Sequence, residues 1–141
     1  MAYIIDLSTD LLPYERAASD GAWCDIKHPA SGAHLGRVKM RSLRCLEVDL
    51  AIHDNIKAGM APIDATRKAI AEFGAVESEG ISIRGEMVCN KRNLLREMVA
   101  DYTSIYTQLL VFASNQDNYD AGESREPVIG PDAQDSPTPE G

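Results

Sequence analysis

The sequence predicts an α+β protein in which an N-terminal β-hairpin is followed by a small bundle of about four helices and a disordered acidic C-terminal tail. Three observations lead to this fold class. Apolar and polar residues alternate in two short runs between Ala22 and Arg41. From Leu43 to Ala113, apolar residues recur mainly at a helical period. After Asn118 the composition becomes acidic and rich in proline and glycine.

The two alternating runs are typical of half-buried strands. In the first run Cys24 and Ile26 fall on one face and Trp23 on the other, while in the second Val38 and Met40 interleave with basic residues. The proline and glycines between the runs predict a loop longer than a tight turn. We therefore expect a hairpin over residues 22–41, preceded in residues 1–21 by either an edge strand or an arm.

The first helix is expected to follow an N-cap at Ser42 and to end at Gly59. The residues expected to form its core-facing stripe lie near a period of about 3.6: Leu43, Leu46, Leu50 and Ile56, with Val48 and Ile52 filling in. Pro62, at a first helical position, predicts a second helix over residues 62–73 that is closed by Gly74.

Two more helices are expected near the end of the chain. Asn90 is the predicted cap of a helix that runs to about Tyr102, and residues 104–113 form a last amphipathic stretch. Between the two pairs of helices, residues 77–88 alternate but contain two glycines, which weaken a strand. We therefore expect an extended linker there.

Length and charge limit the protein class. The 141 residues fit one globular hairpin-plus-helices domain at 1–119 and a flexible tail at 120–141. Residues 116–141 hold seven acidic residues against one basic residue, Arg125, and so account for six of the eight net negative charges. The remaining body lacks the basic excess of a nucleic-acid binder. No apolar run approaches the roughly 20 residues that cross a membrane.

The reactive residues form no recognisable catalytic or metal-binding pattern. Three cysteines, Cys24, Cys45 and Cys89, are an odd number at wide spacings, which is typical of reduced thiols in a cytosol. Cys24 and Cys45 with His28 and His34 offer four zinc ligands, but without the paired spacing of structural zinc sites. No local signature marks a catalytic Cys–His pair. We therefore expect a non-enzymatic protein with no metal and no cofactor.

Two surfaces are candidates for partner binding. Three basic residues of the second strand lie beside Trp23, and form either a docking face for an acidic or helical partner or a solvated sheet face. The apolar faces of residues 94–99 and 105–112 are candidates for a groove. The residues singled out for binding are Trp23, Arg37, Lys39, Arg41, Leu94, Met98, Ile105, Leu109 and Phe112.

The order of these features resembles a family of small phage proteins. Its pattern is approximately W-x-x-I-x-(H/D)-P-x-(T/S)-G, followed by a G-R-(I/V)-x-(V/M) strand. The matching residues are Trp23, Ile26, His28, Pro29, Ser31, Gly32, Gly36, Arg37 and Val38. A second similarity covers NKRNLLREM at residues 90–98 and FASNQDNY at residues 112–119. Together these motifs resemble the tail assembly chaperones of long-tailed, siphovirus-type phages.

The resemblance implies a function and a set of partners. Chaperones of this family bind the tape-measure protein, keep it soluble in the host cytoplasm while the tail tube forms, self-associate, and do not enter the virion. We therefore expect a tape-measure protein or another tail protein as partner, self-association to which Trp23 contributes, and no binding to nucleic acid or membrane. Two alternatives stay open: a structural or connector component of the phage particle, or a small inhibitor of a host protein.

Overall fold

The computed structural model describes residues 4–119, so the predicted tail at 120–141 lies outside the described residues. Helices α1 (Leu7–Asp10) and α2 (Leu12–Asp20) lead into strands β1 (Ala22–Lys27) and β2 (His34–Met40). Next come α3 (Leu46–Lys57) and α4 (Pro62–Ala69), which continues as the π-helical turn η1 (Ile70–Gly74). The remaining elements are β3 (Ala75–Glu79), β4 (Ser82–Ile83), β5 (Glu86–Met87), α5 (Arg92–Asp101), α6 (Thr103–Ser114) and the 3-10 turn η2 (Gln116–Tyr119).

The predicted order, an N-terminal hairpin followed by a helix bundle, is wrong. Helices α1 and α2 precede the strands, and β3 joins the main sheet only after α4 and η1, so helices and strands alternate along the chain. The described residues form a mixed α+β fold with two small antiparallel sheets, one ordered β1-β2-β3 and the other β4-β5.

The expected linker at 77–88 supplies strands instead. Its two glycines, Gly80 and Gly85, argued against a strand, but they lie in turns with φ of 77° and 83°. Glycine adopts such positive φ angles without the steric cost that other residues meet. The glycines therefore mark the ends of short strands, and the residues before Gly80 are free to pair with β2.

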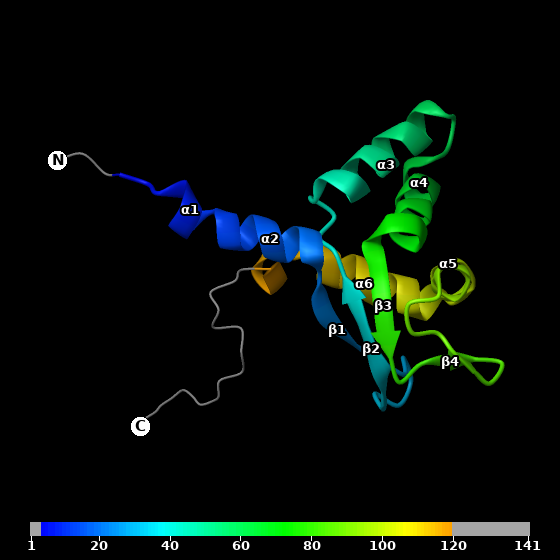
Figure 1. Ribbon diagram of the computed structural model, residues 1–141. Helices are drawn as coiled ribbons and strands as arrows, with labels where there is room; N and C mark the ends of the chain where they lie inside the picture. The colour runs from blue at the N-terminus through cyan, green and yellow to red at the C-terminus, as the bar shows by residue number, and fades with distance from the viewer. Residues whose placement is uncertain (1–3, 120–141) are drawn as a thin grey trace, which may run out of the picture.

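The main sheet has one buried and one open face. Strands β1 and β2 pair antiparallel with Cys24 opposite Val38, and β3 pairs antiparallel with the other side of β2. Cys24, Ile26, Val38 and Met40 are all buried. They belong to one core with residues from η1, α5 and α6, so the two C-terminal helices cover this face of the sheet (Figure 1).

The α3–α4 pair stands apart from this sheet-and-helix body (Figure 1). It has a small cluster of its own, built on Cys45, Val48 and Ala69 with Leu43, Ala51 and Ile52 packed against it. Helix α3 begins at Leu46, later than predicted, and its N-cap is Cys45. Ser42 is buried instead, where its hydroxyl accepts the Arg44 N–H at 3.0 Å and donates to Gln116 Oε1 at 3.0 Å. Helix α4 begins at Pro62 as predicted.

The N-terminal segment is helical, so the expected edge strand is absent from residues 4–20. Helices α1 and α2 project from the body (Figure 1). Helix α2 is held near its end by the Ser42 N–H, which donates to the Ala18 carbonyl at 3.0 Å, and in its first turn by the Tyr14 hydroxyl, which donates to Gln116. Within residues 4–119, no helix has the length and apolar character to cross a membrane.

Candidate protein-interaction surfaces

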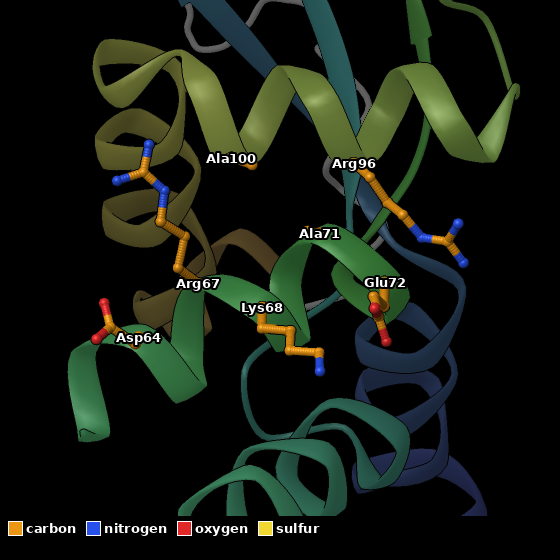
Figure 2. A pocket seen from close by; sticks show the side chains of 7 residues that line it. All are labelled: Asp64, Arg67, Lys68, Ala71, Glu72, Arg96 and Ala100. Atoms are coloured by element: carbon orange, nitrogen blue, oxygen red, sulfur yellow. The ribbon is translucent and has the colours of Figure 1, made fainter. Parts of the chain in front are cut away.

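An open cleft of about 480 Å³ lies between α4–η1 and α5. Its lining combines three basic residues (Arg67, Lys68, Arg96), two acidic residues (Asp64, Glu72) and two alanines (Ala71, Ala100). Figure 2 shows the charged ends of Arg67, Lys68 and Arg96 pointing in different directions. Because these cations do not converge on one point, the cleft lacks the geometry of an anion site.

Arg67 has a structural role at one end of this cleft. Its Nε donates to the Val99 carbonyl at 2.9 Å and its Nη2 donates to Thr103 Oγ1 at 3.2 Å. Its guanidinium carbon lies 4.7 Å from the centre of the Tyr106 ring. The side chain therefore ties α4 to α5 and α6.

The residues weighed as zinc ligands lie in separate environments. Cys24 is buried, and this burial, followed by the nearby Asp25 carboxylate, raises the pKa of its thiol to about 11. Burial also raises the pKa of Cys45, which belongs to the α3–α4 cluster. His34 lies 3.6 Å from Asp25, and His28 Nδ1 accepts the Ala30 N–H at 3.1 Å. Residues 4–119 contain no group of three or more side chains suited to hold a metal ion.

Arg37 and Lys39, here called the basic stripe, lie beside Trp23 on the open face of the sheet, where β3 places acidic residues next to them. Trp23 is opposite Lys39, and Lys39 is opposite Glu77. In the neighbouring row Arg37 lies between Asp25 and Glu79, and its Nε donates to Glu79 Oε1 at 2.8 Å. The Arg37 guanidinium carbon also lies 4.2 Å from the centre of the Trp23 ring.

These contacts change how the stripe is interpreted. Opposite charges in adjacent strands compensate one another, and the guanidinium of Arg37 lies over the half-buried Trp23 ring. Arg41 lies beyond the end of β2 and is occupied elsewhere, because its Nε donates to the Ser19 carbonyl and its Nη1 to the Phe73 carbonyl. The structure thus brings Trp23, Arg37 and Lys39 together as a charge-balanced sheet face and leaves Arg41 out of it.

The candidate residues of α5 and α6 belong mainly to the core. Leu94, Met98 and Leu109 are buried, and Ile105 and Phe112 are partly buried against the same cluster. The apolar faces of α5 and α6 pack on the sheet and on each other, so the buried Leu94, Met98 and Leu109 do not line an open groove. The physical reason is that the sheet needs a cover for its apolar face, and these two helices supply it.

An exposed apolar stripe lies on α3 instead. Leu46 and Leu50 are exposed by 68% and 51%, and Ile56 near the end of the helix by 40%. The residues that α3 buries are Val48 and, in part, Ala51 and Ile52. The expected core stripe of this helix is therefore largely reversed.

A sequence signal for this reversal exists. Residues 48, 51, 52 and 55 have the i, i+3, i+4, i+7 spacing of one helix face. The sequence therefore offers this face as an alternative to the face that carries Leu46 and Leu50. Ile63, at the start of α4, adds a further exposed apolar side chain, exposed by 68%. We call Leu46 and Leu50 the α3 stripe.

Comparisons of the chain with models of protein families, with curated proteins and with solved structures gave no match. The functional interpretation therefore rests on the residues, their geometry and the motifs of the sequence.

Proposed function

We propose that this chain is a non-enzymatic tail assembly chaperone of a long-tailed phage, which binds the tape-measure protein and keeps it soluble in the host cytoplasm. The observation that carries the proposal is the α3 stripe. Leu46 and Leu50 are the most exposed apolar residues of α3, and they lie one helical turn apart on the face opposite its buried residues. The sequence motifs around Trp23 and Gly36 supply the identity of the client.

The spacing of the stripe fits a helical client. Side chains at i and i+4 form the ridges through which two helices pack. Covering a leucine that is half exposed stabilises a complex through the hydrophobic effect, by on the order of 1 kcal/mol for each side chain. A tape-measure protein is a long helical chain with apolar faces, so it offers many segments that such a ridge can engage.

The test is co-expression of this chain with the tape-measure protein of the same genome. The unmodified chain is expected to hold the client in the soluble fraction and to co-purify with it. The double variant Leu46→Glu/Leu50→Glu is expected to fold, because both side chains are exposed, and to lose the client. The matched control is Leu35→Glu, which changes an equally apolar residue, exposed by 44%, on β2.

Two results would overturn the proposal. One is an insoluble client beside a folded, unmodified chain. The other is a client that the double variant still retains, with the urea midpoint of the variant unchanged. A stoichiometric amount of the chain in purified virions would favour the structural-component alternative instead.

A further inference from the structure

Two arginines from different parts of the chain meet at the end of η1. Arg41 Nη1 donates to the Phe73 carbonyl at 2.9 Å. Arg92 Nη1 donates to the Ala71 carbonyl at 2.8 Å, two residues earlier in the same turn. The two guanidinium groups are therefore held near each other, and each keeps further N–H donors that these bonds do not use.

Two more cations continue this row along the cleft between α4–η1 and α5. Arg96 lies one helical turn after Arg92 on α5, and Lys68 lies on α4 across the cleft. Both side chains are exposed, and neither forms a hydrogen bond or an ion pair within residues 4–119. We call Arg41, Lys68, Arg92 and Arg96 the cationic strip.

The charge of the cationic strip is not balanced by its surroundings. None of the five ion pairs within residues 4–119 includes one of its members. Burial lowers the pKa of the Arg92 guanidinium, and the neighbouring charges of Arg96 and Arg41 lower it further. Glu72 opposes this effect and lies on the Arg96 side of the cleft, whereas Asp64 lies at the opposite end (Figure 2). Four cations thus face one carboxylate on a body that is net acidic, since residues 4–119 contain 13 basic and 16 acidic residues.

The chain beyond Tyr119 carries the opposite charge. Residues 120–141 have a net charge of −5, because they contain six acidic residues and one basic residue, Arg125. The acidic residues are distributed along this segment: Asp120, Glu123, Glu126, Asp132, Asp135 and Glu140. Cations that point in different directions do not hold one small anion, but each of them suits a separate carboxylate of a chain that runs along the strip.

This acidic segment starts beside the cationic strip. Tyr119 is buried, and its hydroxyl donates to the Met40 carbonyl at 2.9 Å. Arg41 follows Met40 directly, so one tyrosine side chain bridges the start of the segment and the first residue of the strip. The 13 residues that lead from Tyr119 to Asp132 span at most about 45 Å, which exceeds the roughly 30 Å diameter of a small domain. Tethering also gives the segment an effective concentration on the order of millimolar, at which weak contacts are populated.

We propose that the acidic tail, residues 120–141, docks on the cationic strip of its own chain and covers the cleft between α4–η1 and α5. Charge complementarity and the position of Tyr119 favour this occupant. The basic stripe on the sheet is a weaker competitor, because Glu77 and Glu79 already compensate it. A docked tail excludes other acidic segments from the cleft, so an acidic partner has to displace it. This surface is separate from the α3 stripe, and the proposal does not depend on a tape-measure client.

Paramagnetic relaxation enhancement in the ¹⁵N-labelled full chain tests the contact. A nitroxide is attached through Ala133→Cys in a chain whose exposed thiol is removed by Cys89→Ser, while the other two thiols are buried. The amides of residues 68–72 and 92–96 are expected to lose at least about half of their signal relative to the reduced label. The amides of residues 28–33, between β1 and β2, are expected to keep theirs. At 1 M NaCl the Debye length falls from about 10 Å to about 3 Å, and the loss of signal is expected to disappear.

Charge reversal locates the docking site. Lys68→Glu/Arg96→Glu reverses two exposed members of the strip and is expected to reduce the loss of signal at residues 92–96 at least about twofold. The matched control, Lys27→Glu/Lys57→Glu, changes the net charge equally at exposed lysines outside the strip and is expected to leave the signal loss unchanged. A tail whose six acidic residues are changed, Asp→Asn and Glu→Gln, is expected to lose the contact in the otherwise unmodified body.

Several results would overturn the proposal. Equal broadening in Lys68→Glu/Arg96→Glu, in the neutralised tail or at 1 M NaCl would exclude an electrostatic contact with the strip. Strongest broadening elsewhere in residues 4–119 would assign the tail to another surface, and no broadening would mean that the strip stays open. Broadening of an unlabelled ¹⁵N chain by an equimolar spin-labelled ¹⁴N chain would assign the tail to a second copy. None of these outcomes concerns the client of the α3 stripe, which co-expression tests separately.

Discussion

Two helical pairs of similar size use their apolar residues in opposite ways. The α5–α6 pair buries Leu94, Leu95, Met98 and Leu109 against the sheet, in the largest cluster of the described residues. The α3–α4 pair packs mainly on itself and on η1, around a cluster of three buried residues, and leaves the leucines of α3 exposed. Both pairs are amphipathic, but only one of them has a sheet to cover.

The difference shows that an apolar helix face becomes part of a core only where another element covers it. Helix α3 has apolar residues on two faces, and α4 can bury only one of them because nothing else in residues 4–119 covers the other. Helices α5 and α6 also have more apolar surface than a single contact hides, but the sheet and the neighbouring helix take up most of it. The exposed leucines Leu46 and Leu50 are therefore on the pair that stands away from the sheet.

The largest expected effect is a truncation in the sheet-covering pair. Leu109→Ala removes a fully buried side chain and is expected to lower the free energy of unfolding by about 3 kcal/mol. Leu50→Ala, the same change on the exposed face of α3, is expected to cost less than about 0.5 kcal/mol. Urea denaturation of both variants measures the contrast. Equal losses would mean that the outer face of α3 is covered, and the comparison between the two pairs would fail.

A smaller effect is expected at Arg67, which joins the two pairs. Arg67→Met keeps the apolar stem but removes the hydrogen bonds to Val99 and Thr103 and the cation over Tyr106. We expect a loss of about 1–2 kcal/mol in the free energy of unfolding. The control is Tyr106→Phe, because this buried hydroxyl has no hydrogen-bond partner in the described part of the chain. Its removal is expected to change stability by less than about 0.5 kcal/mol.

The result at Arg67 decides how the pairs are coupled. A loss confined to the α3–α4 pair, seen as faster hydrogen exchange there and not in α6, would show that this pair opens on its own. A uniform loss across both pairs would show one cooperative unit, and the Arg67 contacts would then belong to the core.

The effect that is smallest at neutral pH concerns the buried thiol of Cys24, because it appears only as the pH rises above 9. The folded state raises the pKa of Cys24 from 9.0 to about 11, because burial disfavours the thiolate. Its contribution to stability is therefore complete below pH 9 and declines as pH rises toward 11, by at most about 1.4 kcal/mol per pH unit. Comparing the urea midpoints of the unmodified chain and Cys24→Ala between pH 8 and 11 measures this contribution, together with the smaller effect of the Cys24 charge on the pKa of Tyr119.

Thiol labelling at pH 8 compares the local stability of the α3–α4 cluster with that of the sheet. Cys89 is exposed and is expected to react at once, whereas Cys24 and Cys45 are buried. Under increasing urea, Cys45 in the α3–α4 cluster is expected to react before Cys24 in the sheet. Simultaneous reaction of the two would remove the difference in local stability between the regions.

Part of the fold was predictable because its signals are local. Alternation located both strands of the β1–β2 pair and the faces of Cys24 and Ile26, and Pro62 marked the start of α4. Helix signals also located α5 and α6 to within about two residues, which is the usual precision of helix ends. Of the candidate site, the grouping of Trp23, Arg37 and Lys39 on one sheet face followed from the same alternation.

Other features depended on distant residues. Whether residues 75–79 form a strand depended on β2 lying beside them, and Glu77 and Glu79 compensate the basic stripe only because of that pairing. By itself, the sequence determined where β1, β2 and α4 to α6 form and which side chains share a face of each, since these follow from the spacing of neighbours. Only the tertiary structure decided that Leu109 is core and Leu50 is surface, because burial depends on which other element lies opposite a face.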